Sequence, residues 1–383
     1  MKLKVAFLNC RSHGDSAVVT FTDKSKPVCI VVDGGEDSNG AAALSDYLKS
    51  EQVRTINLMV GTHIDSDHVN GLKLFAQGEL KKKRAGKPYV KILEFWGPMP
   101  SETLVHNVTP AASPKTKEPR PGVTWQQYMI QSVEQNDDLF EAIRELGAKI
   151  HHPAVDSVPV MPFRAVKIDL LGPDTQISAD HIKSKALGLT ARASAGKAIS
   201  TFEDLQAAVT QNYEQLAVEA NRDANNQSIV FRLAPAVGSA KAKSWQFLFT
   251  GDAEQEAWDE MVGNAKVAAR LSAKVLKIPH HGSAANGITA AGAKKVKPEY
   301  CLNSVGQKHG LPDAPTLKLL RTVSQAILCT QRNDDSKHPS ACRGIPASEC
   351  PAKGKPQNVC FVLDSTTGTC EITPKNRACG HGW

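Results

Sequence analysis

The sequence predicts an α/β fold in which several strand ends converge on one site. Three separate apolar runs read as buried strands, at 56–60, 245–249 and 275–278, and histidine or aspartate follows each of them closely. An α/β sandwich builds its sites where strand ends meet. We therefore expect the segments at 62–68, 249–252 and 278–283 to lie together.

The segment THIDSDH at 62–68 has the densest cluster of metal-capable side chains in the sequence. It places four metal-capable side chains within six residues, namely His63, Asp65, Asp67 and His68. Neutral imidazole and ionised carboxylate are the ligands that hold Zn²⁺ or Mn²⁺. The alternative is a solvated acidic turn with two incidental histidines. Two further matching segments downstream, FTGD at 249–252 and PHHGS at 279–283, count against that alternative.

These motifs, in this order, resemble the metallo-β-lactamase superfamily, and within it the branch of the ComEC-type DNA-uptake hydrolase domain. FLN at 7–9, HGDS at 13–16 and VVDGG at 31–35 are similar to the opening hairpin of that branch. NNQS at 225–228 is similar to its N-N-x-S strand, and SVG at 304–306 with HGLP at 309–312 to its closing segment. The resemblance spans residues 3–328 with insertions. It implies an αββα sandwich and a metal-dependent hydrolase.

The resemblance also implies a site for two divalent metal ions, zinc or manganese. His63 and Asp65 would hold one ion, Asp67 and His68 the other, and Asp252 would bridge both. Asp67 has a competing role, in which it orients the attacking water as a catalytic residue. Asp65 stands where other members carry a second histidine, and the extra carboxylate favours harder ions such as Mn²⁺.

One histidine of the pair 280–281 would complete the second ion. The other would contact a phosphate oxygen or donate a proton. His280 directly follows the strand, which favours it as the ligand and His281 as the catalytic residue, but the sequence leaves this assignment open. Three further residues are expected to contact substrate: Asn226, Ser283 and His309.

The chain departs from the superfamily at one position. Many members carry a further histidine between the first motif and FTGD, but the matching stretch here, LLGP at 170–173, has none. Replacements that the sequence offers are His151, His152, His181 and Asn226.

Two ions close together lower the pKa of a water and stabilise the attacking and leaving oxygens, which suits phosphodiester hydrolysis. The same chemistry suits lactams, lactones and thioesters. The ComEC-type resemblance and the net charge of +7 favour DNA, in single-stranded form, as the substrate. The alternatives are a small-molecule ester, lactone or phosphocholine hydrolase, and a catalytically weak nucleic-acid or signal-binding module.

Composition indicates an ordinary soluble protein. Of 383 residues, 41% are hydrophobic and 22% charged, and no run of 18 apolar residues occurs, so no membrane span is expected. No signal-peptide core follows the N-terminus, so we expect a cytoplasmic protein. Six of nine cysteines follow residue 328, and reduced thiols are the default there, with disulfides left open. The basic run at 81–91 is either a solvated loop or a phosphate contact beside the metal site.

The motifs extend along most of the chain, so we expect one domain over 1–383. Helices are expected at 41–50, 69–80 and 128–146, and a loop or lid at 97–124. A helical insertion at 174–224 would be either a substrate-shaping cap or a passive buttress. A long loop at 331–358 would interrupt a final hairpin with strands at 326–329, 359–363 and 370–372.

Overall fold

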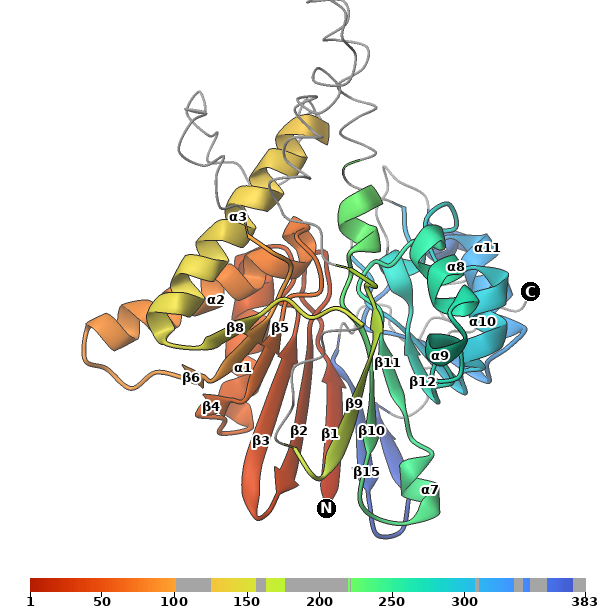
Figure 1. The fold of residues 1–383 in the computed structure, drawn as a ribbon, viewed down its shortest axis with the longest axis horizontal. Coiled ribbons are helices and arrows are strands. Elements are labelled where there is room, and N and C mark those ends of the chain that lie inside the picture. Colours follow the sequence, from red (N-terminus) through yellow and green to blue (C-terminus); the bar gives the residue numbers. More distant parts are fainter. Residues whose placement is uncertain are drawn as a thin grey trace, which may run out of the picture.

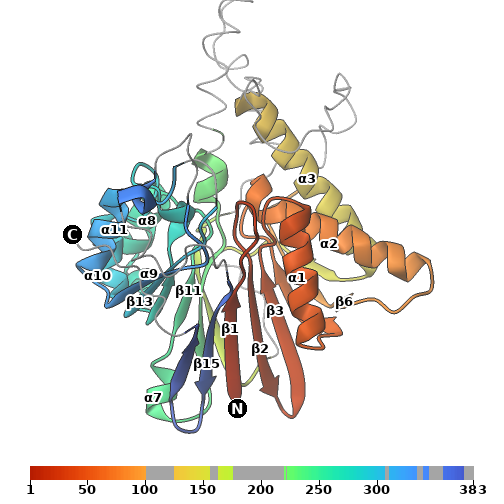
Figure 2. The same ribbon diagram turned by 180° about the vertical axis from the view of Figure 1, so that it is seen from behind.

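Two β-sheets pack face to face, and helices cover the outer face of each (Figures 1 and 2). The computed structural model describes residues 1–100, 125–155, 163–175, 220, 222–306, 310–333, 340–344 and 357–374. This αββα arrangement is the sandwich that the sequence predicts.

The first sheet has eight strands in the order β16-β15-β1-β2-β3-β5-β7-β8. Strands β1, β2 and β3 form an antiparallel meander, while β5, β7 and β8 continue parallel to β3. The bounds are β1 Lys2–Phe7, β2 Ala17–Asp23, β3 Lys26–Val32, β5 Leu58–Val60, β7 Glu94–Trp96, β8 Lys149–His151, β15 Val359–Asp364 and β16 Cys370–Thr373.

The second sheet has six strands in the order β14-β13-β12-β11-β10-β9. Strands β11 to β14 are parallel, and β9 and β10 join them antiparallel. The bounds are β9 Val166–Gly172, β10 Val230–Pro235, β11 Phe247–Phe249, β12 Val275–Lys277, β13 Tyr300–Asn303 and β14 Ala326–Cys329. A separate pair, β4 (Thr55–Ile56) with β6 (Lys91–Ile92), completes the strands.

The main core lies between the two sheets. Successive side chains of a strand point to opposite faces, so Val5 and Phe7 of β1 enter this core while Ala6 faces the helices. Across the interface Phe7 stacks on Phe249, with ring centroids 5.8 Å apart. Within the second sheet Phe231 stacks on Phe249 at 4.9 Å. Both faces of each sheet are covered, which explains why the strands read as nearly continuous apolar runs.

Helices bury an apolar face on each sheet. Helices α1, α2 and α3 cover the first sheet, and α8 to α11 cover the second. Their bounds are α1 Ser38–Ser50, α2 Ser66–Arg84, α3 Trp125–Leu146, α8 Gln255–Gly263, α9 Ala265–Ala268, α10 Ala290–Val296 and α11 Ala314–Arg321, with the short α7 Ala240–Lys243 beside β10. Among the helices that the structure describes, none is long and apolar enough to cross a membrane.

The structure corrects the prediction for the basic run. Residues Lys81 to Arg84 form the last turn of α2 and not a loop, because lysine and arginine are good helix formers and favour a helix C-terminus. Helix α2 begins beside the 62–68 segment, so a rise of 1.5 Å per residue puts the run roughly 20–25 Å from it. Lys82 pairs with Glu79 at 2.5 Å, and Arg84 pairs with Glu145 at 2.5 Å. The run does not lie beside the metal-capable residues.

The predicted final hairpin is also wrong in part. Strand β14 pairs with β13 in the second sheet, whereas β15 pairs with β1 and β16 in the first. Of these three strands, β15 and β16 form a hairpin, whereas β14 extends the parallel part of the second sheet. Most of the lid at 97–124 and of the insertion at 174–224, and much of the loop at 331–358, lie outside the described residues.

Candidate metal centre

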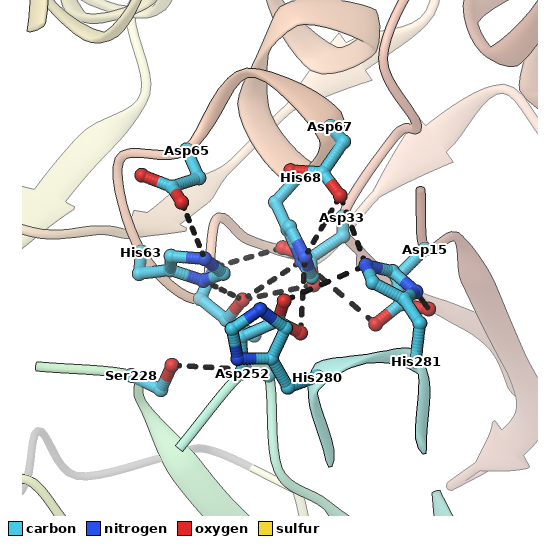
Figure 3. A network of polar contacts seen from close by, with 12 residues as sticks. Asp15, Asp33, His63, Asp65, Asp67, His68, Ser228, Asp252, His280 and His281 are labelled. Carbon is cyan, nitrogen blue, oxygen red and sulfur yellow. Dashed lines mark hydrogen bonds and ion pairs between the residues drawn. The ribbon is translucent and has the colours of Figure 1, made fainter. Parts of the chain in front are cut away.

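Five loops meet at one edge of the sandwich, each at the carboxyl end of a strand. They follow β1, β3 and β5 in the first sheet and β11 and β12 in the second. Figure 3 shows the side chains that these loops bring together. They are His13, Asp15, Asp33, His63, Asp65, Asp67, His68, Asp252, His280 and His281, and all but His280 are buried.

The loop after β5 owes its shape to the start of α2. Asp65 is the N-cap residue in extended conformation, and Asp67 and His68 follow in the first helical turn. A negative charge near a helix N-terminus is favourable, which helps to hold Asp67 ionised. The loop after β1 lies directly against this turn, since Gly14 has φ +103° and a Cβ there would lie 1.9 Å from the carbonyl oxygen of Asp67. Only glycine allows that approach.

The ligand-capable atoms form two tight groups that share His281. One group is Asp15, His68, Asp252 and His281, and the other is His13, Asp67 and His281. His281 Nε2 lies 2.9 Å from Asp67 Oδ2 and 3.5 Å from Asp252 Oδ2. His68 Nε2 lies 3.2 Å from Asp252 Oδ1. Asp252 therefore lies between the residues of the first motif and His281, where a shared carboxylate is expected.

Opposite charges dominate the electrostatics of these groups. Burial alone would raise the pKa of Asp252, but the charges of His68 and His281 hold it well below its usual value. Burial would likewise lower the pKa of His281, but Asp252 and Asp15 raise it to about 9. The carboxylates thus favour positive charge at this point, and a divalent ion would supply it in place of the imidazole protons.

Each of the four histidines of the two motifs has its Nδ1 atom next to an oxygen acceptor. The contacts are His63 with Thr62 Oγ1 at 3.1 Å, His68 with Asp33 Oδ2 at 2.9 Å, His281 with the Ser304 carbonyl at 3.2 Å and His280 with Glu254 Oε1 at 3.5 Å. Metal-binding histidines donate one ring N–H to such an acceptor and leave the other nitrogen for the ion. The Nε2 of His63 and the Oδ1 of Asp65 are buried without a hydrogen-bond partner. The residues therefore fit a metal centre.

Asp33 is the acceptor that holds the first motif together. It accepts hydrogen bonds from the Thr62 amide at 2.8 Å and from the Thr62 hydroxyl at 2.9 Å, besides its contact with His68. Because the Thr62 hydroxyl donates to Asp33, its oxygen can accept from His63. One carboxylate thereby orients both histidines.

A buried ion pair lies beneath the centre. Lys277, at the end of β12, forms an ion pair with Asp15, and its Nζ lies 3.8 Å from Asp252 Oδ1. Burial would lower the pKa of Lys277, but Asp15 and Asp252 raise it. A permanent cation is thus built into the centre, and it balances part of the carboxylate charge.

The comparisons with known proteins agree with this arrangement. Residues 25–207 match the family model of the metallo-beta-lactamase superfamily, and the matched segment contains the whole 62–68 motif. Over this segment the chain is similar to the metallo-β-lactamase superfamily. The members of this superfamily are metal-dependent hydrolases. No characterised protein matches the chain in sequence.

Three of the solved structures that are similar to the chain match it at low identity. The metallo-beta-lactamase fold protein YhfI from Bacillus subtilis has 10% identity and a TM-score of 0.44, over 86% of this chain and 96% of that one. A diphosphatase from the PhnP family has 11% identity and a TM-score of 0.38, over 85% and 94%. A long form RNase Z from yeast has 9% identity and a TM-score of 0.37, over 85% of this chain and 40% of its own.

The side chains expected to contact substrate have structural partners. Asn226 Oδ1 accepts from the amides of Glu254 and Ala257, so it caps the first turn of α8. Ser283 Oγ accepts from the Asn286 amide. His309 lies outside the described residues.

The candidates for the missing histidine are engaged elsewhere or not described. His151 lies on the edge strand β8, 3.9 Å from Glu94, and His152 stacks on Phe140. His181 lies outside the described residues. The sequence reasoning left four residues out of the site: His13, Asp15, Asp33 and Lys277. Three of them could have been found from the sequence, because the motifs HGDS and VVDGG contain them and each motif places aspartate or histidine after a strand.

Proposed function

We propose that this protein is a phosphodiesterase of the ComEC-type branch that hydrolyses DNA, preferring single strands, with two divalent ions of zinc or manganese. The observation that carries the metal-dependent part is the set of four histidines: the Nδ1 atoms of three of them contact an oxygen acceptor, and that of His280 lies 3.5 Å from Glu254 Oε1. Their remaining nitrogens, together with the oxygens of Asp65, Asp67 and Asp252, are the ligands that we assign to the two ions.

Two such ions would lower the pKa of a water and stabilise the negative charge of a phosphodiester transition state. The protein residues have separate tasks. Asp252 would be shared by both ions, since it faces His68 and His281 and, in Figure 3, also lies next to His280. Asp67 contacts both His13, at 3.2 Å, and His281, at 2.9 Å, so its carboxylate is fixed in direction. The acidic ligand set favours hard ions, which bind phosphate oxygens well.

The choice of DNA rests on sequence motifs and on charge. The segments FLN, HGDS, NNQS and PHHGS are together typical of the ComEC-type branch, and the net charge of +7 favours a polyanion. Arg222 adds a cation near the centre. Its Nε lies 3.8 Å from Glu254, and its side chain is half exposed. It is therefore placed to contact a phosphate as well as Glu254.

Two sets of basic residues should differ in their effect on DNA binding. Arg222→Gln is expected to weaken binding of single-stranded DNA and to flatten its salt dependence by about 0.7 in slope for one lost phosphate contact. Replacing Lys81, Lys82, Lys83 and Arg84 together by glutamine should leave affinity and slope unchanged, because that run is remote and partly paired with glutamates. Fluorescence anisotropy at several salt concentrations measures both. Equal losses would contradict this view of the DNA path.

A substrate panel tests the proposed function. Chelator-treated protein reloaded with Mn²⁺ or Zn²⁺ is incubated with end-labelled single-stranded DNA, duplex DNA, RNA, a chromogenic phosphodiester, and a chromogenic ester and lactone. We expect hydrolysis of single-stranded DNA and of the phosphodiester, dependent on added metal. Hydrolysis of the ester or lactone alone would replace the nuclease by a small-molecule hydrolase. Binding of DNA without hydrolysis of any substrate would favour a binding module.

A further inference from the structure

The two adjacent histidines of the PHHGS motif lie in an unusual backbone conformation. His280 has φ 47° and His281 has φ 49°, both in the left-handed region. Few residues other than glycine adopt it without cost. The consequence is that the two rings diverge, with planes 84° apart and centroids 6.5 Å apart. The two side chains can therefore bind at two different places in the metal centre.

His281 belongs to the side of the centre that contains Asp67 and Asp15. Its Nε2 lies 2.9 Å from Asp67, and its Nδ1 lies 3.2 Å from the Ser304 carbonyl and 3.6 Å from Asp15. A carbonyl oxygen only accepts, so His281 donates through Nδ1 and leaves Nε2 for a ligand. In Figure 3 this ring lies beside Asp15, away from His63 and Asp65.

His280 belongs to the side that contains His63 and Asp65. Figure 3 draws His280 next to Asp252 on the side of His63. Its Nδ1 lies 3.5 Å from Glu254, a distance that is long for a hydrogen bond but typical of a site that tightens when it is loaded.

Glu254 is fixed in place by hydrogen bonds with its neighbours, although no role has been assigned to it above. Its side chain is buried, and its Oε1 accepts a hydrogen bond from Asn225 Nδ2 at 2.7 Å. Its backbone amide donates to Asn226 Oδ1 at 3.2 Å. Both asparagines come from the NNQS motif, so that motif fixes a carboxylate behind His280. A buried carboxylate behind an imidazole is the usual partner of a metal-binding histidine.

We infer that the two histidines divide between the two ions: His280 joins His63 and Asp65 at the first ion, and His281 joins Asp67 and His68 at the second. Glu254 is the positioning residue that orients His280. This inference rests on the proposed two-metal function. It also accounts for the missing histidine, because His280 supplies the imidazole that 170–173 lacks.

Metal stoichiometry of paired variants tests this division. Chelator-treated proteins are reloaded with Mn²⁺ or Zn²⁺, desalted, and measured by elemental analysis, with circular dichroism to verify folding. Wild type should hold two ions, and His280→Ala and His281→Ala one each. The variant His63→Ala/His280→Ala removes two ligands of one ion and should still hold one. The variant His63→Ala/His281→Ala removes one ligand of each ion and should hold none.

The outcomes separate this inference from the proposed function. Two ions in His280→Ala would overturn the role of His280. A further double variant, His280→Ala/His281→Ala, tests the alternative. If it holds one ion while His63→Ala/His280→Ala holds none, both histidines bind the second ion. Wild type without any metal would overturn the two-metal function itself and the division with it.

A conservative variant tests Glu254 separately. Glu254→Gln is expected to weaken the first ion about 10- to 100-fold, as measured by competition with a chelating dye, while the second ion binds as in wild type. Glu256→Gln is the matched control, because Glu256 also accepts from the NNQS motif, through Asn226, but is exposed. Equal metal affinities of the two variants would remove Glu254 from the positioning role.

Discussion

Asp252→Ala is expected to abolish hydrolysis while the protein stays folded. The carboxylate faces His68 and His281 of the second ion and lies next to His280 of the first in Figure 3, so its loss removes a ligand from both ions at once. If the ions contribute about 4 kcal/mol of transition-state stabilisation through this residue, the rate falls roughly 10³-fold. The fold should survive because Asp252 is anchored through its backbone amide, which donates to Ser228 Oγ at 3.0 Å.

The measurement is kcat on the chromogenic phosphodiester, with metal content determined in parallel. Asp259→Ala serves as the control, since this exposed aspartate lies on α8, away from the strand ends that form the centre. The variant should retain wild-type turnover. Near-wild-type turnover of Asp252→Ala would show that the FTGD segment does not hold the ions.

Lys277→Met is expected to destabilise the metal-free protein by about 3–5 kcal/mol, because it leaves buried carboxylates without their cation. Lys277 and Asp15 are both nearly inaccessible to solvent, and Asp252 is the second carboxylate that Lys277 faces. The free energy of unfolding in urea measures the loss. Adding Asp15→Asn should recover part of it, since one of the two uncompensated charges then disappears.

Lys167→Met is a matched control on another strand of the same sheet, β9. Lys167 also pairs with a buried carboxylate, Asp169 at 2.7 Å, but Arg232 pairs with that carboxylate as well, at 2.8 Å. Asp169 therefore keeps a cation, and the loss should stay within about 1 kcal/mol. Similar losses in Lys167→Met and Lys277→Met would show that Lys277 has no special electrostatic part in the centre.

The sequence predicted the fold and the meeting of the three motifs because both follow from local pattern. Apolar runs of strand length end directly before His63, Asp252 and His280, and strands of a sandwich end at common edges. The helix after this motif was predicted at 69–80, whereas α2 already begins at Ser66. What the sequence missed depends on contacts between distant parts of the chain.

Asp33 and Lys277 are residues whose roles depend on such distant contacts. Asp33 gains its role only from contact with Thr62 and His68, which lie about thirty residues further on. Lys277 reads as one more strand-end lysine until Asp15, from the other sheet, lies against it. The place of β14 could not be predicted either, because a strand pattern does not say which of two sheets will accept it.

The amount of bound metal tests the two-ion centre most directly. Protein purified without chelator, and again after reloading with Mn²⁺ or Zn²⁺, is measured by elemental analysis against protein concentration. Two ions per chain are expected after reloading, removed by chelator and restored by metal together with hydrolysis of the phosphodiester. A value near zero after reloading, in protein shown to be folded, would contradict the two-ion centre.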